Sequence, residues 1–278
     1  LRKQLSGKAA DVSPYVGRNE HGLRGSTSPK DLETLMQLVY LNFTAPRFDP
    51  DDFGTFYNQY KGYLENMNSN PDYLFKKQLL QTLYDGNERA QIISAELLDK
   101  VNFSRLSAIN RMLFPDANEF VFTFVGNIDP EVLKPLVEKY IGSIPTTKDR
   151  LELVDDHVDI VTGQVSEDFN TVMQQPKVSV FFGFSGTENY SLKNNLVLTM
   201  LCEALSTRYH ETIREEMGAT YGVGAAGSLD YLPTEKYFVQ VMCDTNEKQA
   251  DDVQAAIMAE LEKIAQEGPK AEDIEKTR

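Results

Sequence analysis

The sequence repeats one structural pattern twice, and this repeat constrains the fold more than any other feature. In both copies an expected strand leads to a polar cap, an amphipathic helix, a proline break and the acidic start of another helix. The copies span residues 25–53 and 244–274 and share few identical residues. A pattern kept with little identity is typical of duplicated structural units, so we expect two similar units in one chain.

The first copy gives clear helix signals. Ser28 is a favourable N-cap, Pro29 suits the first helical position, and Pro46 stops the pattern. Between them, apolar residues recur at helical spacing. Further helices are expected from Asp49 onward, over residues 71–84, near residues 96–100, after Ser104, and over residues 131–140, 191–214 and 246–266.

Strands are expected where aromatic and β-branched residues gather or alternate with polar ones. The clearest candidate is residues 119–125; the others are residues 177–184, 220–228 and 236–243, with a further strand near residues 157–161. Several of these strands lie at hairpin distance, which favours antiparallel sheets over a βαβ series. The expected fold class is therefore α+β, with two homologous units that each pack a mostly antiparallel sheet against helices.

The repeat also suggests boundaries. We place the first unit at residues 1–145, a polar linker at residues 146–175, and the second unit at residues 176–278. The first copy lacks opening strands, and the second copy stops where the first continues. We therefore expect the start of the first unit and the end of the second to be truncated, in a chain that is part of a longer protein.

The composition argues against several functional classes. The net charge is −14, and almost all of the acidic excess lies after residue 150. Such a surface cannot replace the counterions around phosphate groups, so we expect no nucleic-acid partner and no anionic membrane. No apolar run approaches the ~18 residues of a membrane-spanning helix. Cys202 and Cys243 lie in apolar patterns and are expected to be buried and unpaired.

Three glycines match a dinucleotide-binding fingerprint by letter. They are Gly222, Gly224 and Gly227. That fingerprint works when a strand enters the glycines and a helix leaves them, so that the helix N-terminus faces the pyrophosphate. Here a helix enters and a strand leaves, which argues against a nucleotide. The glycines are expected to let a strand pass close to another backbone or to a substrate.

No metal-binding motif is present. The three histidines, His21, His157 and His210, are far apart, and the helical H-x-x-E-H pattern of zinc peptidases does not occur. Glu20 and His21 keep only the end of that pattern, among turn residues, so His21 is expected to be exposed to solvent. The sequence therefore predicts no metal ligand in this chain.

Arg214 and Tyr221 are the candidate functional residues. An expected helix runs up to Arg214, Gly218 breaks it, and a strand begins near Tyr221. A guanidinium and a phenol are donors that could stabilise a carbonyl oxygen as it gains negative charge. The structural alternative is a cation near a helix C-terminus followed by a strand aromatic. The residues by themselves leave both interpretations open.

Residues 213–223 resemble the signature of the C-terminal half of the pitrilysin (insulinase) family of zinc metallopeptidases, which includes mitochondrial processing peptidase. Residues 31–47, 124–129 and 144–145 fit the same family in the expected order, so the resemblance covers nearly the whole chain. It implies four homologous units in two halves, of which this chain resembles the third and fourth. The family's zinc site lies in the N-terminal half.

The resemblance implies roles for both candidate residues. Tyr221 would donate to the scissile carbonyl oxygen, and Arg214 would hold the substrate backbone and orient Tyr221. Because H-x-x-E-H is absent, this fragment is expected to bind no zinc and to cleave no peptide by itself. Zinc is expected in the absent N-terminal half, which would be its partner, with a peptide as substrate.

An alternative of the same fold stays open. Core subunits of respiratory complexes share this fold, so the chain is also compatible with a catalytically inert scaffold or partner subunit. The resemblance to long bacterial forms favours the periplasm or cell envelope, with the cytoplasm left open.

Overall fold

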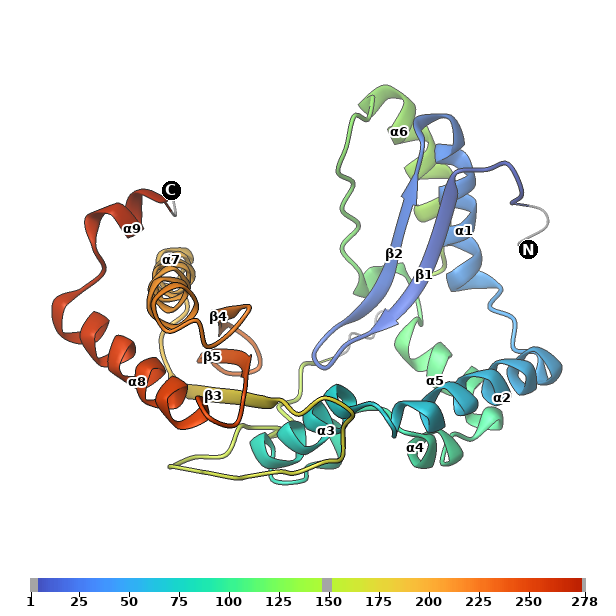
Figure 1. Ribbon diagram of the computed structural model, residues 1–278. Helices are drawn as coiled ribbons and strands as arrows, with labels where there is room; N and C mark the ends of the chain where they lie inside the picture. Colours follow the sequence, from blue (N-terminus) through green and yellow to red (C-terminus); the bar gives the residue numbers. More distant parts are fainter. Residues whose placement is uncertain (1–4, 147–151, 277–278) are drawn as a thin grey trace. The chain divides into compact units, whose positions relative to one another are not determined.

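The computed structural model describes residues 5–146 and 152–276, which form two compact units (Figure 1). The first unit combines Leu1–Met67 with Ile93–Leu153, and the second combines Asn68–Ile92 with Val154–Arg278. The units are therefore interleaved along the chain. The boundaries expected from the sequence, at residues 145 and 176, stay a prediction.

The first unit contains an antiparallel hairpin with helices. Strand β1 (Ala10–Val16) pairs with β2 (His21–Thr27), and α1 (Leu32–Thr44) packs against both strands. Leu64 on α2 forms a small buried cluster with two residues of α4. The other elements are the α-helices α2 (Pro50–Met67), α4 (Ala95–Asp99), α5 (Phe103–Leu113) and α6 (Pro130–Leu136), the π-helical turn η4 (Val137–Ile141), and two 3₁₀ turns, η1 (Pro29–Asp31) and η3 (Ala117–Glu119).

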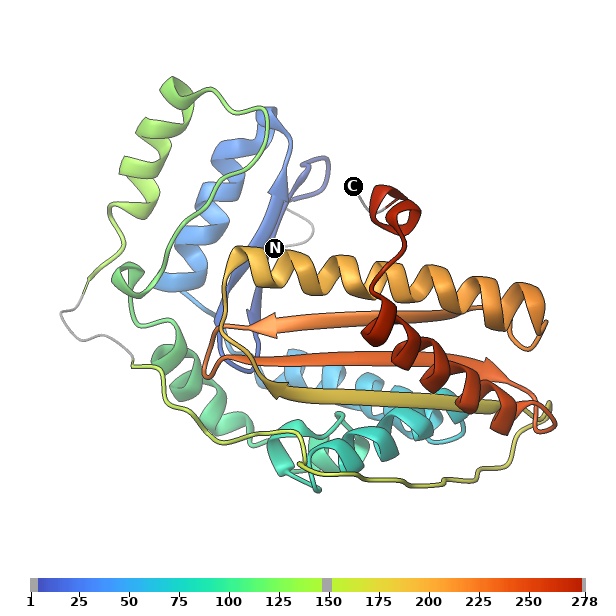
Figure 2. The same ribbon diagram turned by 90° about the vertical axis from the view of Figure 1, so that its left-hand side faces the viewer.

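The second unit contains a three-stranded antiparallel sheet in the order β3-β5-β4 (Figure 2). Its strands are β3 (Val178–Thr187), β4 (Val223–Asp230) and β5 (Lys236–Thr245). Ser179 lies opposite Asp244 in the β3–β5 ladder. The helices of this unit are α3 (Pro71–Leu83), α7 (Leu192–Tyr209), its π-helical continuation η5 (His210–Glu216), α8 (Ala250–Glu267) and α9 (Ala271–Lys276).

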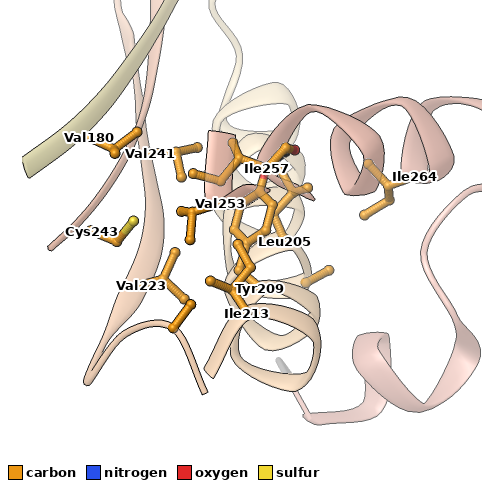
Figure 3. Close-up of a cluster of buried hydrophobic side chains, with 12 residues drawn as sticks. Val180, Leu205, Tyr209, Ile213, Val223, Val241, Cys243, Val253, Ile257 and Ile264 are labelled. Atoms are coloured by element: carbon orange, nitrogen blue, oxygen red, sulfur yellow. Dashed lines mark hydrogen bonds between the residues drawn. The ribbon is translucent and has the colours of Figure 1, made fainter. Parts of the chain in front are cut away.

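The main hydrophobic core lies between this sheet and helices α7 and α8 (Figure 3). Tyr209 is fully buried there, and its hydroxyl donates to the Ile257 carbonyl at 3.3 Å, which joins the two helices. Burying each such side chain stabilises the fold by about 1.5–3 kcal/mol. The buried residues that the close-up labels are Val180, Leu205, Tyr209, Ile213, Val223, Val241, Cys243, Val253, Ile257 and Ile264.

The structure confirms the α+β class and the order of the repeat. In the first unit β2 leads to α1, and Pro46 separates α1 from α2. In the second unit β5 leads to α8, and Gly268, with φ of +77°, ends that helix before α9. The predicted helices are present, with ends shifted by a few residues.

The strand predicted over residues 119–125 is wrong. The side chains alternate as predicted, since Phe120 and Phe122 are half-buried while Val121 and Val125 are 94% and 91% exposed. However, the segment joins no ladder with any strand of the described residues. Alternation fixes which side chains point inward, but a strand also needs a neighbouring backbone to pair with.

The strand predicted near residues 157–161 is also absent. His157 has a φ of +52°, in the left-handed region that extended strands do not use. Val158 is buried, and the Val161 N–H donates to the Leu83 carbonyl at 2.9 Å. The backbone of the segment thus bonds to the end of α3 and joins no ladder of the described residues, although Asp159 pairs with Lys236 of β5.

No helix within residues 5–146 or 152–276 has both the length and the apolar character needed to cross a membrane.

Candidate functional site

The turn between η5 and β4 positions both candidate residues. Arg214 lies on η5, whose last turn closes with a bond from the Met217 N–H to the Thr212 carbonyl at 3.0 Å. Gly218 follows with a φ of +58°, a conformation that favours glycine because a side chain would be strained there. The Ala219 N–H then donates to the Ile213 carbonyl at 3.0 Å. The chain therefore leaves the helix sharply and enters β4 just after Tyr221.

Tyr221 projects fully into solvent, with a relative exposure of 101%. Arg214 is about half-exposed, and its Nε lies 3.7 Å from Glu215 Oε1, a weak surface contact. Among the described residues, no hydrogen bond or ion pair joins Arg214 to Tyr221. Both groups belong to the second unit.

An open hollow of about 270 Å³ lies beside Tyr221. Tyr221 and its neighbours form one wall, and the end of β5 forms the other: the lining residues are Thr220, Tyr221, Gly222, Met242, Cys243 and Asp244. The hollow is smaller than the roughly 300–1,000 Å³ typical of sites that enclose small molecules. A larger hollow, of about 460 Å³, lies at Pro176 and residues 246–249, away from both candidates.

A charged group borders the first hollow. Asp244 accepts bonds from Lys177 Nζ at 2.8 Å and from Ser179 Oγ at 2.6 Å, and Lys177 also reaches Asp72 at 2.7 Å. Burial raises the pKa of Asp244, but the bonds from Lys177 and Ser179 outweigh it and lower the pKa below its usual value. The bonds to Asp244 and Asp72 raise the pKa of Lys177. Both groups therefore stay charged at neutral pH.

The described residues contain no group of three or more His, Cys, Asp or Glu side chains that could hold a metal ion.

The expectation of a solvent-exposed His21 is wrong. His21 is half-buried and meets Phe114 and Phe120 edge-on at ring-centroid distances of 5.4 and 5.5 Å. Phe114 and Phe120 lie more than ninety positions from His21 in the sequence. The residues next to His21 in the sequence therefore gave no sign that it would be buried.

Cys202 and Cys243 are free and buried, as predicted. Burial raises the pKa of the Cys243 thiol to about 11 and also raises that of Cys202, so neither is an activated nucleophile.

A close contact in the structure explains why β4 has a glycine at position 227. A Cβ added there would lie 2.8 Å from Cys202 Sγ, so the missing side chain lets α7 pack closely on the strand.

Comparison with known families identifies the chain. A family model described as the peptidase M16 inactive domain matches residues 112–278, more than half of the sequence. The chain belongs to this family. The match confirms the predicted resemblance to the zinc metallopeptidases and agrees with the missing zinc motif.

Relatives support the same assignment. The chain is 22% identical over 233 residues to the probable zinc protease PqqL of Escherichia coli K12. The aligned segment covers 83% of this chain and 25% of PqqL. It therefore spans about a quarter of that relative. A zinc protease PQQL-like protein of Arabidopsis thaliana is 28% identical over 116 residues, 41% of this chain and 12% of that protein.

Solved structures show the same fold. The periplasmic protease PqqL of Escherichia coli superposes with a TM-score of 0.78 at 18% identity, over 99% of this chain and 30% of that one. A peptidase M16 inactive domain from Pseudomonas fluorescens gives a TM-score of 0.73 at 16% identity, over 99% of this chain and 67% of that one.

Proposed function

We propose that this chain is the substrate-binding, non-catalytic half of a zinc-dependent endopeptidase that acts on peptides. The exposed Tyr221 phenol carries the proposal, because among residues 5–146 and 152–276 it has no hydrogen-bond partner and it borders an open hollow. Membership of a family named for an inactive domain supports the assignment of zinc to another part of the protein.

The chemistry of the two donors fits amide hydrolysis. When water attacks a peptide bond, the carbonyl oxygen gains negative charge, and a positioned hydroxyl stabilises that charge more than it stabilises the ground state. Tyr221 is assigned this role. Arg214 supplies a planar fork of donors that suits the carbonyls of a substrate backbone. Neither residue activates water, so the zinc-bearing half must do so.

Reconstitution tests the proposal. This chain by itself is expected to bind no zinc and to leave a quenched fluorescent peptide intact. The complete protein, with the zinc-bearing half present, is expected to cleave the peptide and to lose activity when zinc is removed by a chelator. Cleavage by this chain alone would contradict the proposal.

The alternative is a catalytically inert scaffold or partner subunit of the same fold. It predicts that the complete protein contains no bound zinc and hydrolyses no peptide, while the two halves still associate. Metal analysis of the complete protein, together with a peptide assay, separates the two proposals.

A cell-envelope location is proposed on the basis of one relative. The solved PqqL of Escherichia coli is described as a periplasmic protease. Fractionation of cells that express the complete protein tests this, and recovery only in the cytoplasm would contradict it.

A further inference from the structure

We propose that Thr220 is a positioning residue for Tyr221, so that turnover depends on a hydroxyl whose hydrogen bonds hold the turn that carries Tyr221. The inference rests on the proposed function, since it concerns how Tyr221 is aimed. It assigns a role to a residue next to the candidate donor.

The Thr220 hydroxyl encloses Tyr221 in a small hydrogen-bonded turn. Its Oγ1 accepts from the Gly222 N–H at 3.2 Å, and the Gly222 carbonyl lies 2.9 Å away. The same oxygen lies 2.6 Å from the carbonyl of Asp244, near the end of β5. The single hydroxyl hydrogen serves one carbonyl at a time, and the shorter contact is to Asp244. The turn that carries Tyr221 is thereby attached to the sheet.

Without this attachment the turn has few constraints. Gly218 and Gly222 flank it, and glycine leaves the backbone more freedom than any other residue. No atom lies within 4 Å of a Cβ built on Gly222, so packing does not fix that position. Tyr221 itself is fully exposed, so the backbone alone sets the direction of its Cα–Cβ bond.

Two other side chains hold the turn only on the helix side of Tyr221. Thr245 Oγ1 donates to the Ala219 carbonyl at 2.7 Å, and Gln249 Nε2 donates to the Met217 carbonyl at 3.3 Å. Only Thr220, among the side chains with described bonds to this turn, also reaches Gly222 beyond Tyr221. Loss of the Thr220 hydroxyl should therefore change the orientation of the Tyr221 side chain more than it changes the stability of the fold.

The substitution Thr220→Val tests this in the complete protein with its zinc-bearing half, because valine keeps the shape and removes the hydroxyl. A misplacement of about 1 Å can cost on the order of 10²-fold in rate, so kcat is expected to fall roughly 10- to 100-fold. KM, zinc content and Tm are expected to change little. Thr220→Ser restores the hydroxyl and is expected to recover most of kcat.

Thr199→Val is the matched control. Thr199 Oγ1 also donates to a backbone carbonyl, that of Asn195 at 3.0 Å, but on the exposed face of α7. It is expected to leave kcat unchanged. If Thr220→Val lowers Tm strongly, the pair Thr220→Ser and Thr220→Ala isolates the hydroxyl without the γ-methyl group.

A double-mutant cycle with Tyr221→Phe decides the route of action. If Thr220 acts through the phenol, Thr220→Val adds little once that hydroxyl is gone, because coupled residues are not additive. An equal loss in both backgrounds, or unchanged kcat in Thr220→Val beside a slow Tyr221→Phe, overturns the inference and leaves the proposed function intact. Full turnover in Tyr221→Phe overturns both.

Discussion

Arg208 and Asp273 face each other inside the second unit, with the guanidinium Nε 3.7 Å from a carboxylate oxygen. Both side chains are almost completely buried, and Arg208 also donates to the Gly268 carbonyl at 2.9 Å. The pair links α7 to α9 across the break that ends α8. Removing one partner of a buried pair of this kind is costly, because water cannot solvate the charge that is left behind.

Asp273→Ala is therefore expected to destabilise the chain by about 1–3 kcal/mol, since the buried guanidinium loses this carboxylate but keeps the Glu260 carboxylate, 3.9 Å away, and the Gly268 carbonyl. Urea denaturation measures the loss. Glu272→Ala, on the exposed side of the same short helix, is the control and should stay within about 0.5 kcal/mol of the parent. A cost below about 1 kcal/mol for Asp273→Ala would show that the pair does not hold α9 in place.

Stability is expected to decline at high pH because two buried acids resist ionisation. Burial raises the pKa of Cys243 from 9.0 to about 11 and that of Tyr209 from 10.0 to about 12. The unfolded chain releases these protons first, so their contribution is complete below pH 9.0 and is lost as the pH rises through about 11 and about 12. Denaturant midpoints across this range measure the decline.

Cys243→Ala separates the thiol from other titrating groups. It removes one of the two raised pKa values, so its stability should fall less steeply above pH 9.0 than that of the parent. Equal slopes for parent and variant would mean that the Cys243 thiol contributes nothing to the decline.

Gly227→Ala is expected to cost about 1–3 kcal/mol, because the new methyl group would overlap Cys202 Sγ. Cys202→Ala should recover part of that loss in the double variant, since the two positions touch. Gly222→Ala meets no atom within 4 Å and serves as the control for stability. Thermal unfolding of the four variants provides the comparison; additive losses would refute the contact.

Arg214→Lys is expected to raise KM roughly tenfold in the complete protein, as the loss of one charge-assisted bond of about 1.5 kcal/mol would do. Lysine keeps the charge but not the planar fork. Arg105→Lys, in the first unit, is the control. Steady-state kinetics on a peptide measure both, and an unchanged KM for Arg214→Lys would remove Arg214 from substrate binding.

Local signals predicted the helices well. Breaks such as Pro46 act within a few residues, so the sequence shows them directly. The Ser28 cap was wrong in detail, because Ser28 precedes a 3₁₀ turn over Pro29–Asp31, its side chain makes no cap bond, and α1 begins at Leu32. The strand over residues 119–125 failed because its pattern is local while its pairing is not. The hairpin of β1 and β2 was foreseen only as a strand before the first helix.

The candidate site divides in the same way. Arg214 and Tyr221 stood out because a helix, a glycine and a strand follow one another around them. The Lys177–Asp244 pair was missed, since those residues are 67 positions apart. The β3–β5 register, with Ser179 opposite Asp244, brings them together. The bond from Thr220 to the Asp244 carbonyl depends on the same long-range pairing.

The central claim is that the Tyr221 phenol stabilises the transition state of a reaction whose zinc lies elsewhere. The most direct test is kcat of Tyr221→Phe in the complete protein, with zinc content and Tm measured on the same samples. Loss of one such donor should lower kcat by about 10²-fold, with zinc content and Tm unchanged. A kcat equal to that of the parent would contradict the claim.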